Sequence, residues 1–118
     1  MELATFEQVY EAYRVFILDL DGTLSNQSAR IPGVADSVHR LMTDPSKKVL
    51  FFTNGGYATL DYTVSQVIRL LRDGLSADKW AEIESMVNKN IVYNTAQLTA
   101  KYMRSKLQPN DKVLVFGN

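Results

Sequence analysis

The stretch from Val15 to Leu24 constrains the fold of this chain more than any other segment. It begins with four consecutive apolar residues, Val15 to Leu18, and two of them are β-branched, which is typical of a strand buried on both faces in a parallel sheet. Asp19 and Asp21 follow two positions apart, so an extended backbone would point both carboxylates the same way. Two such carboxylates repel each other unless a cation or a shared proton relieves the repulsion. The stretch therefore predicts a polar site at the end of a buried strand.

A second apolar stretch lies one helix further along the chain. Lys48–Thr53 predicts another buried strand, and it ends in the segment Thr53-Asn54-Gly55-Gly56. A helix expected over residues 32–42 joins the two strands, which makes a right-handed parallel unit. Because ligands bind at the carboxyl ends of strands in such sheets, we expect this segment to lie beside Asp19 and Asp21. Its glycines would let backbone N–H groups approach an anion closely.

The rest of the chain alternates helical and extended patterns. Residues 25–30 are polar and predict an exposed loop, and the single histidine, His39, is interpreted as a surface residue rather than as a base. Trp80 is interpreted as a core residue. Further helices are predicted over residues 6–14, 60–72, 77–87 and from 94 or 95 to 107, with strands at 91–93 and 112–116. This order predicts an α/β fold with a Rossmann-like parallel sheet and flanking helices, as one domain over residues 1–118.

Composition excludes several classes of function. The 13 basic and 13 acidic residues cancel, which gives no support for binding nucleic acid or an anionic membrane. The chain has no cysteine, so it has no disulfide, no thiolate metal site and no cysteine nucleophile. No apolar run approaches the ~18 residues that would span a bilayer. The expectation is a cytoplasmic protein that binds neither nucleic acid nor membrane.

The Val15–Leu24 stretch resembles the first signature of the haloacid-dehalogenase superfamily of phosphohydrolases. The resemblance implies that Asp19 is the nucleophile that attacks phosphorus and that Asp21 is the acid/base serving the leaving group. It also implies Mg²⁺ held by the Asp19 carboxylate and the Asp21 backbone carbonyl. The chemistry is coherent without the family, because one carboxylate can form a covalent phosphoryl intermediate while a second shuttles a proton. The alternative is an ordinary Asp-Gly turn after a strand.

Thr53-Asn54 resembles the second signature of this superfamily, whose hydroxyl and neighbouring amides bind the phosphoryl group. The resemblance implies that Thr53, Asn54 and Gly55 bind the phosphate of a small phosphorylated metabolite. The longer string Phe-Phe-Thr-Asn-Gly-Gly is similar to the subfamily of 4-nitrophenylphosphatases, phosphoglycolate phosphatases and pyridoxal phosphatases. Many of those have a second Asn where this chain has Gly55, so only a backbone role is implied there.

The resemblance also implies that parts of a complete site lie elsewhere. The family supplies a lysine and a further acidic metal ligand from sequence beyond the third strong strand, and its cap is inserted there. We therefore expect these residues to be a partial core that stops before the cap and the last core strands. Lys47 and Lys48 precede a strand and would lie at the wrong end of the sheet to replace that lysine. In the family the nucleophile strand has a later strand on its other side, so here we expect an exposed edge, with either self-association through it or further polypeptide.

The sequence thus predicts a Mg²⁺-dependent phosphomonoester phosphatase acting through a phosphoaspartate, with weak or no activity from these residues alone. The alternative is a noncatalytic phosphate-binding or protein-interaction module derived from such an enzyme. A plain α/β domain whose Asp-Gly turn has no function is the third hypothesis.

Overall fold

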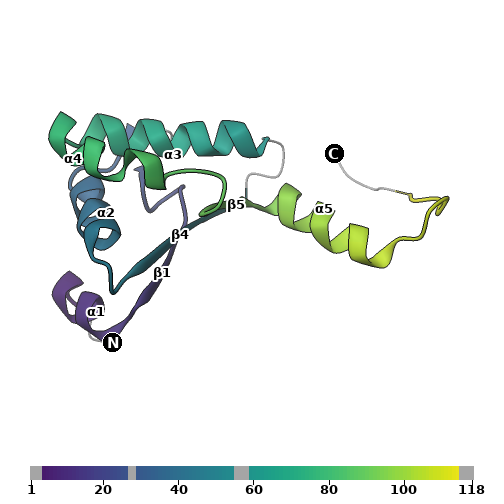
Figure 1. Ribbon diagram of the computed structural model, residues 1–118, viewed down its shortest axis with the longest axis horizontal. Helices are drawn as coiled ribbons and strands as arrows, with labels where there is room; N and C mark the ends of the chain where they lie inside the picture. The colour runs from purple at the N-terminus through teal and green to yellow at the C-terminus, as the bar shows by residue number, and fades with distance from the viewer. Residues whose placement is uncertain (1–3, 27–28, 55–58, 115–118) are drawn as a thin grey trace.

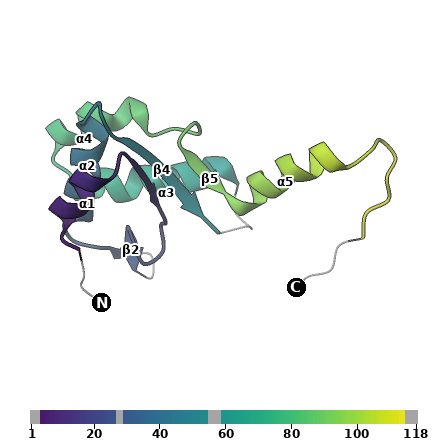
Figure 2. The ribbon, with the colours of Figure 1, turned by 90° about the horizontal axis from the view of Figure 1, so that it is seen from below.

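The computed structural model describes residues 4–26, 29–54 and 59–114. Its centre is a three-stranded parallel sheet in the order β1 (Val15–Leu18), β4 (Lys48–Thr53), β5 (Val92–Asn94) (Figure 1). A separate antiparallel pair is formed by β2 and β3, of which β2 is labelled in Figure 2. This is the α/β arrangement that the sequence predicts. The strands are β1 Val15–Leu18, β2 Ser25–Asn26, β3 Ala29–Arg30, β4 Lys48–Thr53 and β5 Val92–Asn94; the α-helices are α1 Phe6–Ala12, α2 Val34–Thr43, α3 Leu60–Gly74, α4 Ala77–Ile83 and α5 Thr95–Lys106.

The core lies between the sheet and one layer of helices. β4 is the middle strand, and its Phe51 pairs in register with Leu18 of β1 and Val92 of β5. Phe51 is fully buried, as are the α3 and α4 side chains that meet the core, Val67 and Ile83. Burial of this apolar face stabilises the fold by about 25 cal/mol per Å² removed from water.

The prediction that β1 is covered on both faces is wrong. Phe16 and Leu18 are half-buried under the helices, but Val15 and Ile17 on the other face are 45% and 61% exposed. Figures 1 and 2 show the reason: α2, α3 and α4 all lie on one side of the sheet. Among the described residues, the opposite face of β1 has no helix against it, so its alternate side chains meet solvent.

The helix predictions are largely confirmed, and side chains at the N-termini explain where several helices begin. Thr5 accepts a hydrogen bond from the Gln8 backbone N–H and completes a capping box at α1. Ser76 accepts from Lys79 N–H at the start of α4. α4 is shorter than predicted, because its last turn is a 3₁₀ helix over Glu84–Met86.

Two predictions of local structure are wrong. The loop expected at residues 25–30 contains the short strands β2 and β3, which pair Ser25 with Arg30. The strand expected at 112–116 is absent over 112–114, where Val113 and Leu114 are 50% and 78% exposed, and residues 115 and 116 lie outside the described part. A β-branched, apolar run forms a strand only beside a partner strand. α5 instead carries this segment away from the sheet (Figure 1).

α1 is held to the turn before β4 by a bond that should depend on pH. The Tyr10 hydroxyl donates to the Asp44 carboxylate, which also accepts from the Ser46 backbone N–H at 2.9 Å and the Ser46 hydroxyl at 2.7 Å. These bonds, that of Tyr10 first, lower the pKa of Asp44 from 3.8 to about 2. A carboxyl whose pKa is lower in the folded chain adds stability above its unfolded pKa and loses it as pH falls.

We expect Tyr10→Phe to lower the midpoint of urea unfolding at pH 6, because the variant loses this bond. The gap from the wild type should shrink as pH falls from about 4 to about 2, since the Asp44 carboxylate then becomes progressively protonated and its bond with Tyr10 weakens. Tyr13→Phe, which removes the hydroxyl of a 61% exposed tyrosine just after α1, is the matched control. An unchanged gap at pH 2 would contradict the assignment.

Candidate functional site

Residues 19–25 form a turn after β1, called the acidic turn here because it carries Asp19 and Asp21. Buried and exposed residues alternate at its start. Leu20 is 5% exposed and packs into the core, whereas Asp19 and Asp21 on either side of it are exposed. The backbone N–H of Leu20 donates to the Asp19 carboxylate at 2.8 Å, which restrains that side chain. The core thus fixes Leu20, and both carboxylates are left at the surface where the strand ends.

A single carbonyl closes this turn. The Leu20 carbonyl accepts backbone hydrogen bonds from Thr23 at 3.2 Å, Leu24 at 2.9 Å and Ser25 at 3.0 Å. Gly22 has φ of 82°, a left-handed conformation that costs other L-residues roughly 1 kcal/mol or more. Leu24 is buried and anchors the far side of the turn. The acidic turn is therefore a fixed structure on the core.

The second polar segment, Thr53-Asn54, lies at the same end of the sheet as the acidic turn, where the parallel strands have their carboxyl ends. β1 and β4 are parallel, and Leu18 pairs with Phe51, so Asp19 and Thr53 each follow that pair within two residues. Neighbouring strands lie about 4.8 Å apart, which brings the two segments close together. Thr53 is half-buried and Asn54 is exposed. Gly55, the third predicted phosphate-binding residue, lies outside the described part of the chain.

The structure adds two residues to this edge that the sequence did not assign to a site. Asn94 ends β5 opposite Thr53, is 1% exposed and donates from its amide to the Thr63 hydroxyl at 3.3 Å. Its side-chain oxygen also accepts from Gln97 N–H at 2.8 Å and so caps α5. Ser25 is buried and its hydroxyl donates to the Leu20 carbonyl at 3.4 Å. Only the cap at Asn94 had a signal in the sequence.

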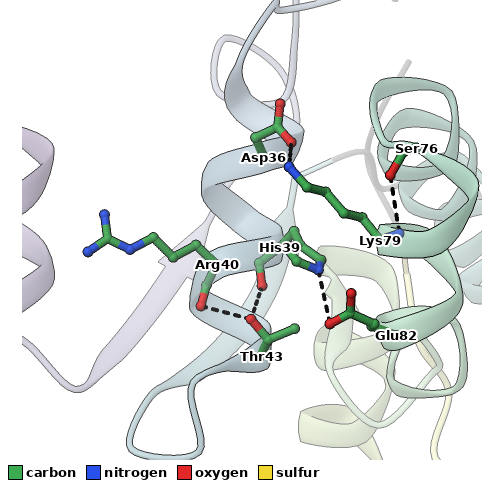
Figure 3. A network of polar contacts seen from close by, with 7 residues as sticks. All are labelled: Asp36, His39, Arg40, Thr43, Ser76, Lys79 and Glu82. Atoms are coloured by element: carbon green, nitrogen blue, oxygen red, sulfur yellow. Dashed lines mark hydrogen bonds and ion pairs between the residues drawn. The ribbon is translucent and has the colours of Figure 1, made fainter.

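His39 lies away from this edge, in the layer of helices. Figure 3 shows it on α2 facing α4, where its Nε2 is 3.6 Å from a Glu82 carboxylate oxygen. Beside it, Lys79 donates to Asp36 at 2.8 Å, and this ion pair also joins the two helices. The His39 side chain is 14% exposed, so it is more buried than the surface position predicted. It lies between these two helices and pairs with Glu82 there.

Two lysines lie at the opposite end of the sheet, whereas Arg30 of β3 pairs with Ser25 and its guanidinium donates to the Asp73 carbonyl. Lys47 and Lys48 precede or begin β4, as predicted, and Lys47 Nζ donates to the Tyr13 carbonyl at 2.7 Å. The part of the chain that the structure describes holds no cluster of three side chains able to ligate a metal ion. The two exposed carboxylates of the acidic turn still fit Mg²⁺, because this ion is commonly held by one or two carboxylates together with substrate phosphate and water.

Comparison with known proteins gives the family. A family model described as haloacid dehalogenase-like hydrolase matches residues 16–118, and this chain therefore belongs to the haloacid dehalogenase-like hydrolases. The crystal structure of the hypothetical protein PH1952 from Pyrococcus horikoshii is similar, with a TM-score of 0.58, 21% identity and coverage of 82% of this chain. At that identity the likeness supports the fold alone.

The relatives are much longer than the matched segment. This chain spans 32% of the Pyrococcus horikoshii structure. The putative NipSnap protein K02D10.1 of Caenorhabditis elegans is 34% identical over 58 residues, which are 49% of this chain and 11% of that protein.

No helix in the described residues is long and apolar enough to cross a membrane.

Proposed function

We propose that this chain provides the nucleophile and part of the phosphate-binding site of a Mg²⁺-dependent phosphomonoester phosphatase. The observation that carries the proposal is the position of the acidic turn and of Thr53-Asn54, which follow adjacent parallel strands at one edge of the sheet. The family match, which covers both segments, gives independent support. The resemblance to 4-nitrophenylphosphatases and their relatives makes a small phosphorylated metabolite the proposed substrate. The absence of cysteine suits a reducing cytoplasm.

In this proposal the reaction has two steps, transfer of the phosphoryl group to Asp19 and its hydrolysis, and Asp21 moves a proton in each. An Asp19 carboxylate oxygen attacks phosphorus, the bond from phosphorus to the ester oxygen breaks, and Asp21 gives its proton to the departing alcohol. Asp21 then takes a proton from water, which attacks phosphorus and releases phosphate and the Asp19 carboxylate. The fixed Leu20 anchor keeps the two carboxylates on the same turn during both steps.

The remaining groups would bind the phosphoryl oxygens and balance charge. The Thr53 hydroxyl and the Asn54 amide would donate at the carboxyl ends of the strands, where the transferring group carries most negative charge. Mg²⁺ held by Asp19 and the Asp21 carbonyl would neutralise part of that charge. The described residues bring no lysine to the carboxyl ends of the strands, which supports the expectation of low activity from these 118 residues by themselves.

The lack of such a lysine among the described residues also favours the second candidate, a noncatalytic module that binds phosphate or a protein partner. The two are separated by measuring release of 4-nitrophenol from 4-nitrophenyl phosphate with Mg²⁺ and with EDTA, alongside phosphate binding by calorimetry. Turnover that needs Mg²⁺ and is saturable supports the phosphatase. Binding of phosphate with no turnover, in this chain and in any longer natural form of it, would support the module.

A further inference from the structure

We propose that Asn94 is a positioning residue for the candidate site, which holds the segment Thr53-Asn54 in place from the neighbouring strand and from helix α3. The inference rests on the proposed function, since it takes that segment to bind phosphate. Asn94 is the last residue of β5 and pairs in register with Thr53, the last residue of β4. Its proposed action is through the groups around it and not through contact with substrate.

The Asn94 side chain lies in the core, on the face of the sheet that the helices cover. Alternate residues of a strand share a face, so Asn94 is on the same face of β5 as Val92, which is 0% exposed. Thr53 is likewise on the same face of β4 as Phe51. Asn94 itself is 1% exposed. Burying an amide is costly unless its oxygen and its nitrogen both find partners, so those partners show what Asn94 holds.

The two halves of this amide bind two different helices. Its oxygen accepts from the Gln97 backbone N–H at 2.8 Å and caps α5, which follows β5 directly (Figure 1). Its nitrogen donates to the Thr63 hydroxyl of α3 at 3.3 Å. The side chains that cap α1, α3 and α4 are hydroxyls on exposed residues, namely Thr5, Thr59 and Ser76. Capping a helix therefore needs neither an amide nor burial, and the bond to Thr63 is an additional task of Asn94.

From Thr63 the hydrogen bonds continue to the residue where α3 begins. The Thr63 hydroxyl donates to the Thr59 carbonyl at 3.1 Å. Thr59 is the N-cap of α3, and its own hydroxyl accepts from the Tyr62 backbone N–H at 3.1 Å. Asn94 is thus connected, through one hydroxyl, to the first turn of α3.

This connection matters because residues 54–59 join β4 to α3 and include part of the phosphate-binding segment. Register with β5 fixes one end of the connection at Thr53. The bonds through Thr63 fix the other end at Thr59. Asn94 is common to both ends, so one buried side chain would set the distance between the end of β4 and the start of α3. A misplacement of about 1 Å in such a site can cost about 10²-fold in rate.

The test is a titration of this chain with inorganic phosphate in the presence of Mg²⁺, followed by the backbone amide signals of Thr53 and Asn54 in NMR. Thr63→Val keeps the shape of a 1% exposed side chain and removes the hydroxyl that accepts from Asn94. Asn94→Ser keeps a good cap for α5 and removes the amide nitrogen. We expect each variant to weaken phosphate binding about five- to tenfold and to shift both signals before phosphate is added.

Three further variants separate positioning from a general loss of stability. Because both changes remove the same bond, the double variant of Asn94→Ser and Thr63→Val should bind about as weakly as either single variant. Thr63→Ser keeps the hydroxyl and should bind like the wild type. Ser76→Ala removes the cap of α4, a helix outside the candidate site, and should lower the midpoint of urea unfolding while phosphate binding stays normal. If circular dichroism shows Asn94→Ser to be unfolded, the comparison of Thr63→Val with Thr63→Ser decides the question.

The outcomes distinguish this inference from the function on which it rests. A wild type that binds no phosphate would overturn both. Wild-type affinity in Thr63→Val, additive losses in the double variant, or a loss in Ser76→Ala equal to that in Thr63→Val would overturn the role of Asn94 alone and leave the proposed function standing.

Discussion

Asp19→Asn is expected to abolish Mg²⁺-dependent hydrolysis of 4-nitrophenyl phosphate, with a loss of at least about 10³-fold in kcat. The amide is close to the carboxylate in size, so the acidic turn and its Leu20 anchor should persist. What is lost is the nucleophile, because a neutral amide oxygen is a poor attacking group toward a phosphate ester. Activity should be measured on these 118 residues and on any longer natural form of the chain, since weak turnover is expected of these residues by themselves.

A matched control and a second variant make this result specific. Asp111→Asn carries the same change at an exposed aspartate beyond α5 and should keep wild-type activity. Asp21→Asn should also lower kcat, with a larger loss for substrates whose leaving alcohol is more basic, because that alcohol needs the proton most. An Asp19→Asn enzyme that keeps more than a small fraction of wild-type turnover would refute the assignment of the nucleophile.

The edge that carries the candidate site could be predicted from short-range patterns. Apolar runs ending in Asp19 and in Thr53 gave two strands, and the helix between them implied parallel pairing, which the structure confirms. Parallel strands end at the same side of a sheet, so the meeting of the two polar segments followed from connectivity alone. Their catalytic roles stay predictions, since they came from the resemblance to a family.

What the sequence missed depends on contacts between distant residues. The run at Val15–Leu18 is apolar throughout, and nothing in it says that α1 to α4 would all lie on one side and leave Ile17 exposed. The run at 112–116 is as β-branched as β4 but lacks a strand to pair with over its described residues. Asn94 lies beside the candidate site because β5 pairs with β4 in a register that puts Asn94 opposite Thr53. That register is set by pairing across the sheet. Local propensity cannot supply such information.

Phe51→Ala is expected to lower the free energy of unfolding by about 3–5 kcal/mol, the largest stability effect predicted for this chain. Phe51 is 0% exposed in the middle strand, and its neighbours Leu18 and Val92 are themselves held by the sheet, so the cavity cannot collapse fully. A typical domain has only 5–15 kcal/mol of stability, and the variant should therefore be near the limit of folding. Urea unfolding followed by circular dichroism measures the change.

Matched variants connect this loss to the middle of the sheet. Tyr102→Ala removes an aromatic ring that is 64% exposed on α5 and should change stability by less than about 0.5 kcal/mol. Phe51→Leu, which keeps most of the volume, should cost about 1–1.5 kcal/mol and remain folded for assay. Because Thr53 follows Phe51 by two residues on the same face of β4, this folded variant should also bind phosphate more weakly than the wild type. A loss below about 1 kcal/mol in Phe51→Ala would mean that the core is not centred on β4, and the placement of Thr53 beside the acidic turn would lose its support.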